Sequence, residues 1–211
     1  MRAKKLDNLK EWRDRMKAEG KIKSSYEPFE KNGDLAELIG VVLGDGHIYK
    51  HVRCESLRIV GSGNNPGFAQ RYASLVENIF GKKPHVALRS AEYAINITIY
   101  QREIAARLGI PAGSRKNLVY ELPPWIQDEP QHIIYFLRGL YEAEGCLAHH
   151  EGTYTHKFQF SNVNRSLLDI VFNELQKLGF HPHRSPKQIQ VSRKEEVQKL
   201  ANLLQFRNYG P

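Results

Sequence analysis

The sequence predicts an α+β fold made of two similar halves, and two observations carry this prediction. Apolar helical runs at residues 35–46 and 136–145 each end in a carboxylate followed by a glycine, Asp45-Gly46 and Glu144-Gly145. After each run come two extended segments, a helix, a longer extended stretch and a short amphipathic helix. Both halves therefore read αββαβ with a closing helix, and we expect some strands to pair as hairpins.

The expected elements have closely matching spacing in the two halves. In the first half they are the extended segments 47–50 and 55–61, the helix 68–80, the extended stretch 84–100 and the helix 101–108. In the second half they are 146–149, 155–161, the helix 165–178, the stretch 181–192 and the helix 194–204. We predict a basic helical extension (1–33), a first repeat (34–110), a linker (111–129) and a second repeat (130–211).

Small residues recur four positions apart in both motif helices. They are Ala36, Gly40 and Gly44 in the first helix and Gly139 and Ala143 in the second. Residues at i and i+4 share one helix face, so each helix offers a stripe with almost no side chain. Such stripes allow two helix backbones to approach closely. We therefore predict that the two motif helices pack on each other through these residues.

The carboxylate at the end of each helix is unusual. A negative charge in the last turn opposes the helix macrodipole and costs about 0.3–1 kcal/mol at an exposed site. If the small stripes pack together, Asp45 and Glu144 emerge side by side. Two carboxylates offer the hard oxygen ligands that Mg²⁺ prefers, commonly beside phosphate oxygens. The pattern predicts a cation between the two helix ends.

Helix starts are also indicated. Asp34 precedes the first motif helix with Glu37 three residues later, which is a capping-box spacing with Asp34 as the cap. Pro130 is placed for the first turn of the second motif helix. These signals set the expected beginnings of the two helices.

Charge and composition restrict the partners. Thirty-one Lys and Arg residues against 23 Asp and Glu give a net charge of +8, which favours a polyanion, with nucleic acid before anionic membrane. No apolar run approaches the length of a membrane span, and the two cysteines form no disulfide framework. We expect a cytoplasmic protein without a signal segment.

The first 33 residues carry half of the net charge. Leu6, Leu9 and Trp12 would share one face of a helix there. Two interpretations stay open at this point: a solvated helix packed on the body, or a contact to a nucleic-acid backbone.

The two nine-residue motifs, LIGVVLGDG at 38–46 and LRGLYEAEG at 137–145, resemble those of the LAGLIDADG homing endonucleases. The resemblance covers most of residues 34–207, including the LPPWI segment between the repeats and the FSN segment at 160–162. It is closest to single-chain members that carry two motifs. One such nine-residue motif would be weak evidence for this family. Two of them, each at the start of a duplicated segment in a basic chain, are strong evidence for the resemblance.

This resemblance implies a pseudo-twofold, duplicated αββαββα homing-endonuclease fold. Its two antiparallel sheets would form a saddle over double-stranded DNA, with the motif helices packed at the centre. The last acids, Asp45 and Glu144, would be the catalytic metal ligands, with Gly44 and Ala143 beside them at the metal. The implied cofactor is Mg²⁺, with Mn²⁺ able to substitute and Ca²⁺ supporting binding without cleavage. A monomeric enzyme of this kind cuts both strands at a long site and leaves short 3′ overhangs.

Base readout would come from the sheet face opposite the core. The alternation of polar and apolar residues in the expected strands supplies such a face, and Arg, Asn and Gln have suitable geometry for the major groove. The alternative is an ordinary solvated sheet face. The candidate DNA-contacting residues are Arg53, Arg58, His85, Arg89, Asn96, Thr98, Lys157, Gln159, Arg184, Lys187, Gln188, Gln190 and Arg193.

Active family members commonly place lysines around the metal. Here residues 61–63 are Gly-Ser-Gly and 161–163 are Ser-Asn-Val, so Ser62, Ser161 and Asn162 are the candidates to support the acids. The leading hypothesis is an intron-encoded DNA endonuclease, and the absence of terminal splicing segments disfavours an intein. The missing lysines favour the alternative, a non-cleaving binder such as an RNA maturase or a DNA-binding regulator. A purely structural domain would leave the charge and the paired acids unexplained.

Overall fold

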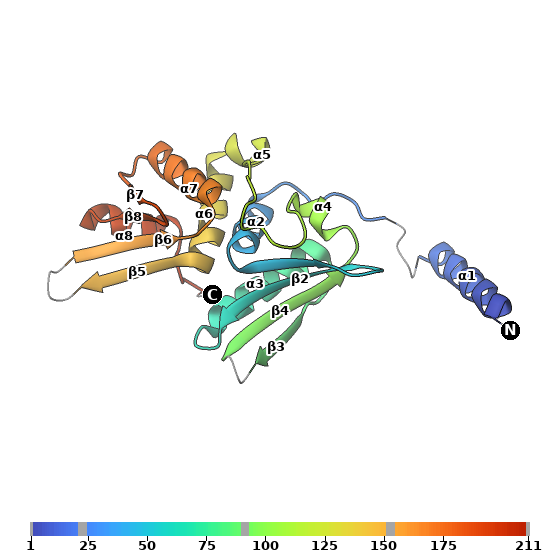
Figure 1. The fold of residues 1–211 in the computed structure, drawn as a ribbon. Coiled ribbons are helices and arrows are strands. Elements are labelled where there is room, and N and C mark those ends of the chain that lie inside the picture. The colour runs from blue at the N-terminus through green and yellow to red at the C-terminus, as the bar shows by residue number, and fades with distance from the viewer. Residues whose placement is uncertain (1, 21–24, 90–92, 151–154, 210–211) are drawn as a thin grey trace.

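A computed structural model describes residues 2–20, 25–89, 93–150 and 155–209, without the side chains of 2–7 and 150. Two lobes, each with one sheet and its helices, lie on either side of a central helix pair (Figure 1). The predicted α+β fold with a duplicated αββαββα arrangement is confirmed. None of the described helices is long and apolar enough to cross a membrane.

The first lobe begins after an N-terminal helix, α1 (Arg2–Ala18). Its elements are α2 (Gly33–Asp45), β1 (Gly46–Lys50), β2 (Glu55–Ser62), α3 (Pro66–Phe80), β3 (His85–Arg89), β4 (Ala94–Gln101) and α4 (Ile104–Leu108). A connection containing the short helix α5 (Pro124–Gln127) then leads to the second lobe. That lobe contains α6 (Pro130–Glu144), β5 (Gly145–His150), β6 (Thr155–Ser161), α7 (Arg165–Lys177), β7 (His183–Ser185), β8 (Gln188–Val191) and α8 (Lys194–Leu203).

The two sheets have the same topology. Their strand orders are β1-β2-β4-β3 and β5-β6-β8-β7, and every pairing is antiparallel. Alternate residues of each sheet point inward, among them Ile48, Leu57 and Ile97 in the first and Phe158 and Ile189 in the second, all at most 1% exposed. The side chains between them point to the opposite face of each sheet, as the period of two along a strand requires.

The two motif helices, α2 and α6, pack on each other through glycines, as predicted. A Cβ on Gly40 would lie 2.2 Å from the carbonyl oxygen of Phe136, and one on Gly139 would lie 2.1 Å from that of Glu37. Ala36 in the same stripe is fully buried. These distances leave no room for any side chain at the two crossing glycines. The helix pair therefore joins the repeats by backbone-to-backbone contact.

The start of α2 differs from the sequence prediction. Asn32, not Asp34, is the cap: its side-chain oxygen accepts a hydrogen bond of 3.0 Å from the backbone N–H of Leu35. Asp34 lies in the first turn, where its charge still suits the helix dipole. Glu37 is fully buried and binds Arg71, so it does not close a capping box. The position of Pro130 at the start of α6 is as predicted.

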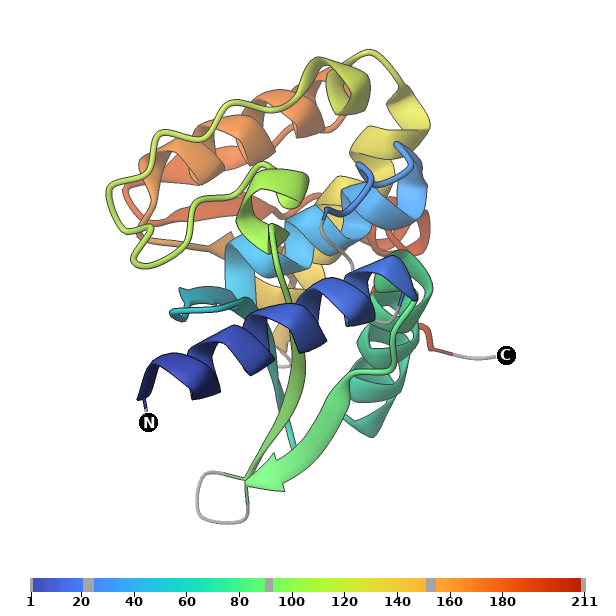
Figure 2. The same ribbon diagram turned by 90° about the vertical axis from the view of Figure 1, so that its right-hand side faces the viewer.

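The helix α1 lies to one side of the two lobes and crosses in front of them in the second view (Figure 2). Leu9 and Trp12 are 57% and 47% exposed, so they do not pack into the core. The side chain of Leu6 lies outside the described part. Of the two interpretations of this segment, the packed helix is the less consistent with these exposures.

Candidate metal centre and nucleic-acid interface

The ends of the two motif helices meet at the centre of the molecule. A Cβ on Gly44 would lie 2.5 Å from the Cβ of Ala143 and 3.2 Å from the Cγ of Glu144. Asp45 and Glu144 are the last residues of α2 and α6, and each is followed directly by the first residue of a strand. The tight crossing at the glycines therefore brings the two carboxylates together, as the spacing of the small residues predicted.

The electrostatics of these acids call for a cation. Burial, and then the charge of Glu144, raise the pKa of Asp45 from 3.8 to about 7. Burial also raises the pKa of Glu144. Among the described residues, no Lys, Arg or His forms an ion pair with either carboxylate. Two half-buried acids held close without a basic partner are destabilised when ionised, and a divalent cation would relieve that.

The donor set fits a hard metal ion. Two carboxylates are the typical protein contribution to a Mg²⁺ site that is completed by water and phosphate oxygens. The described residues contain no cluster of three or more His, Cys, Asp or Glu side chains, so an all-protein cage for zinc is not formed there. The site thus suits a metal shared with a phosphate.

A cavity of about 220 Å³ opens beside Glu144. Its walls come from both lobes and from the linker: His47 at the start of β1, Arg115 and Lys116 of the linker, and the loop at residues 162–164 before α7. Asn162, one of the three predicted supporting residues, donates a hydrogen bond of 3.2 Å from Nδ2 to Glu144 Oε1. Glu144 is therefore oriented by a neighbour.

The other two predicted supporting residues bind elsewhere. The Ser62 hydroxyl accepts a hydrogen bond of 3.2 Å from the backbone N–H of Asn64. The Ser161 hydroxyl accepts one of 3.2 Å from Gln188 Nε2. In the described structure, neither serine hydrogen-bonds to Asp45 or Glu144.

Sequence reasoning missed the basic groups of the linker. Arg115 Nη2 donates to the carbonyl oxygen of Val42 at 2.8 Å and also to that of Gly46. These carbonyls lie at the C-terminal end of α2, where a cation is favoured by the helix dipole. The next residue, Lys116, is exposed and lines the same cavity. The Arg-Lys pair was visible in the sequence, but only the course of the linker brings it to the acids.

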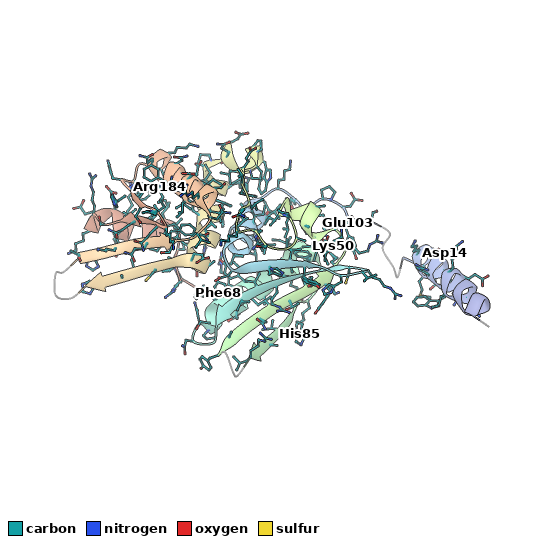
Figure 3. The ribbon with its side chains drawn as sticks, viewed as in Figure 1. Asp14, Lys50, Phe68, His85, Glu103 and Arg184 are labelled. Carbon is teal, nitrogen blue, oxygen red and sulfur yellow. The ribbon has the colours of Figure 1, made fainter. Side chains whose placement is uncertain are left out.

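The outer face of the first sheet carries a row of polar residues across all four strands. The register aligns His47 with Arg58, Arg58 with Thr98, and Thr98 with His85. His85 lies on β3, an edge strand of this sheet (Figure 3). Asn96 and Arg89 lie on the same face, at alternate positions of β4 and β3. Five of the predicted DNA-contacting residues of this half, all except Arg53, thus share one face of the sheet, where Thr98 is only 8% exposed.

The second sheet repeats the row with different chemistry. Cys146 is aligned with Gln159, Gln159 with Gln190, and Gln190 with His183. The two glutamine side chains are joined by a hydrogen bond of 3.0 Å. Lys157 and Gln188 alternate with these positions on the same face. His47, Arg58, Thr98 and His85 therefore have Cys146, Gln159, Gln190 and His183 as their counterparts.

Three predicted DNA-contacting residues lie beyond the strands. Arg53 is in the β1–β2 turn, Lys187 is in the β7–β8 turn, and Arg193 precedes α8 and pairs with Glu196 at 3.0 Å.

Arg184 is placed differently from the prediction. It aligns with inward-pointing Ile189 and pairs with Asp169 of α7. Figure 3 labels Arg184 beside this helix. This side chain lies on the helix-covered side of the sheet and is not part of the outer face that carries the other predicted DNA-contacting residues.

Comparison with known proteins agrees with this geometry. Residues 131–208 match the family model of the LAGLIDADG-like domain. Mesophilic variants of the homing endonuclease I-DmoI superpose with a TM-score of 0.56 at 18% identity, covering 82% of this chain and 94% of theirs. The chain has the fold of these homing endonucleases, and its residues 131–208 are similar to the LAGLIDADG-like domain.

Two further solved structures have this fold. The homing endonuclease I-WcaI, bound to its DNA recognition sequence, has a TM-score of 0.55 at 15% identity, covering 87% of this chain and 84% of its own. The N-terminal LAGLIDADG domain of DUF199/WhiA has a TM-score of 0.57 at 12% identity, covering 83% of this chain and 82% of its own. I-DmoI itself has been observed in complexes with DNA and calcium, and with DNA and manganese.

Among curated proteins, the tRNA-splicing ligase RtcB of Pyrococcus furiosus is 24% identical over 143 residues. The match covers 58% of this chain and only 14% of that protein. This chain thus corresponds to a small part of the ligase.

Proposed function

We propose that this protein is a site-specific, metal-dependent double-strand DNA endonuclease. The observation that carries the proposal is the convergence of Asp45 and Glu144 at the ends of two helices packed through Gly40 and Gly139. A fold shared with homing endonucleases supports it, and so does the net charge of +8. By the same argument the chain acts as a monomer, since one chain supplies both acids. The proposal also takes the enzyme to be intron-encoded and cytoplasmic.

Asp45 and Glu144 would hold Mg²⁺, with the backbone at Gly44 and Ala143 beside it, and Mn²⁺ could replace it. When bound, such an ion polarises a phosphoryl oxygen and makes water nucleophilic near neutral pH. Asn162 keeps the Glu144 carboxylate oriented. The closeness of the helices sets the distance between the acids, because neither backbone can shift without a clash at the glycines. The two acids would serve two scissile phosphates across the minor groove, which yields short 3′ overhangs.

Recognition of the target would use the outer faces of the two sheets. Arg58 has the geometry to pair with guanine, and Gln159 and Gln190 have the geometry to pair with adenine. The rows on the two sheets differ at three of four positions, so the two half-sites would differ in sequence. A long, non-palindromic site follows from this arrangement.

One observation favours a second function, a binder that no longer cuts. Residues 61–63 and 161–163, at the ends of β2 and β6, contain no lysine or arginine. A protein of this kind would bind DNA or RNA through the same sheets. The linker residues Arg115 and Lys116 weaken this alternative because they bring positive charge to the acids from another direction.

Cleavage of a randomised duplex library in Mg²⁺ and in Ca²⁺, with sequencing of every new end, separates these functions. The endonuclease predicts paired ends with short 3′ overhangs at one long motif in Mg²⁺ alone. Retention of specific duplexes without new ends in either metal would contradict it and support the binder, with RNA as the next ligand.

A further inference from the structure

The linker runs along the cavity beside Glu144. Arg115 Nη2 anchors it to the end of α2 through the carbonyl oxygens of Val42 and Gly46. The N–H of Gly113 donates to the carbonyl oxygen of Ile48 in β1 at 2.9 Å. Asn164 of the second lobe donates from its amide to the backbone carbonyls of Arg115 and Leu118, at 3.1 and 2.8 Å. The linker is therefore held by both lobes at this place.

This anchoring positions two cationic side chains. Lys116 is exposed and lines the cavity that also contains Glu144 and His47. Arg115 Nη1 is buried, and no described residue accepts a hydrogen bond from it. Burial of this guanidinium lowers its pKa, yet arginine stays charged in proteins. An unsatisfied guanidinium nitrogen and a free ammonium beside a metal-binding acid suit an anion, and a phosphate is the anion that a DNA partner would bring.

The equivalent place on the other side of the helix pair is different. Asn65, the cap of α3, corresponds to Asn164, the cap of α7. Its amide donates to the hydroxyl oxygen of Tyr209 at 3.0 Å, and that hydroxyl in turn binds the carboxylate of Glu142. Among the described residues, a neutral phenol thus stands where the linker places a backbone carrying Arg115. The linker therefore brings the charge of Lys116 to the side of the helix pair where Glu144 and Asn162 line the cavity.

We propose that Lys116, held in place by Arg115, binds one of the two scissile phosphates, the one beside Glu144, and that the strand carrying this phosphate is cut faster. The proposal rests on the proposed endonuclease function. Lys116 would contact the phosphate, whereas Arg115 positions the linker. A preorganised cation at a phosphate of this kind acts on charge that develops during the displacement.

The test follows both strands of the selected duplex separately, each with its own fluorescent label. Lys116→Met is expected to slow one strand by at least about tenfold and the other by less than about twofold. Supercoiled plasmid would then accumulate as nicked circle. Lys116→Arg should restore most of the rate, because it keeps the charge. Lys199→Met, on the exposed side of α8 and outside the proposed interface, is the matched control for losing one lysine.

A binding measurement tests the same contact without cleavage. In Ca²⁺, each central phosphate is replaced in turn by an uncharged methylphosphonate. Wild type should bind more weakly when one particular phosphate is replaced, whereas the affinity of Lys116→Met should not change with that replacement. The slope of log affinity against log salt concentration should also be smaller by about 1 in the variant. Equal slowing of both strands, or identical methylphosphonate profiles for the two proteins, would overturn the inference. Absence of cleavage by wild type would refute the proposed function instead, and the binding profiles would still decide on Lys116.

Discussion

The two lobes are alike inside and different outside. Each contributes a glycine to the helix crossing, an acid at the helix end and a four-stranded sheet of the same order. Their outer rows differ: His47, Arg58, Thr98 and His85 in the first lobe, against Cys146, Gln159, Gln190 and His183 in the second. At the contact between α2 and α6, packing allows only glycine at positions 40 and 139. A residue on the outer face of a sheet has no such constraint. Under the proposed function, the two halves would address unequal half-sites while they keep one shared centre.

The acids show the same contrast. Glu144 accepts a hydrogen bond from Asn162, while the described residues include no side-chain hydrogen bond to Asp45. The position equivalent to Asn162 in the first lobe is Gly61, since Gly46 pairs with Ile59 as Gly145 pairs with Phe160. The linker adds its charge on the side of Glu144. Glu144 is thus oriented by a neighbouring side chain, whereas no side chain among the described residues orients Asp45 by a hydrogen bond.

The largest expected effect breaks the shared centre itself. Asp45→Asn removes one anionic ligand, so the cleavage rate should fall by about 1,000-fold, or about 4 kcal/mol of barrier. The affinity for the target duplex in Ca²⁺ should change little by comparison, because the sheets make most contacts. Single-turnover cleavage and equilibrium binding measure the two quantities. An unchanged rate would remove Asp45 from the catalytic centre.

The next effect concerns the feature that the lobes share. Gly40→Leu should destabilise the fold by about 3 kcal/mol or more, since the new Cβ would meet the carbonyl oxygen of Phe136 at 2.2 Å. Gly139→Leu should do the same. Thermal unfolding gives the comparison, with Ala106→Leu on the exposed side of α4 as the control for an added leucine. A melting temperature equal to that of the control would show that the helices do not cross at these glycines.

A smaller effect sharpens the contrast between the outer rows. Arg58→Ala and Gln159→Ala occupy equivalent positions, and each should cost about 1–3 kcal/mol at a single base pair, in opposite half-sites. Arg58→Ala should also reduce the dependence on salt, because it removes a charge, whereas Gln159→Ala should not. Competition binding with singly substituted duplexes measures both. Loss of preference at the same base pair for both variants would contradict the assignment of one sheet to each half-site.

The smallest effect is a pH dependence. In the metal-free protein the pKa of Asp45 is raised from 3.8 to about 7, so its ionisation favours the unfolded state. Its contribution to stability is therefore full below pH 3.8 and is lost as the pH rises toward 7. Over that interval the melting temperature of wild type should fall relative to that of Asp45→Asn. Added Mg²⁺ should reduce this difference in melting temperature. Parallel pH profiles without metal would contradict the burial of this carboxylate.

Much of this architecture was predictable from local pattern. Small residues four apart predicted the helix crossing, and the acid after each stripe predicted the centre, because both depend only on helix periodicity. The alternation along β4 placed Asn96 and Thr98 on one face for the same reason. The predicted cap of α2 was wrong by two residues. Asn32 and Asp34 are both suitable cap residues, but the buried Glu37 side chain accepts a hydrogen bond from Arg71 and so cannot close a capping box with Asp34.

The remaining errors depend on tertiary structure. Arg184 was predicted to contact DNA, but the register of the three-residue strand β7 turns it toward Asp169. The linker residues Arg115 and Lys116 were missed because the local sequence does not determine the path of a connection of this length. Its path is decided by hydrogen bonds to Val42 and Asn164, which are far away in the sequence.

The most direct test of a shared centre is the anomalous scattering of Mn²⁺ in crystals of the protein with its selected duplex. Our account predicts manganese within coordination distance of both the Asp45 and the Glu144 carboxylates and of a central phosphate. Loss of that signal in Asp45→Asn would be the matching control. Manganese bound away from these two acids, or absent from their neighbourhood while DNA occupies both sheets, would contradict it.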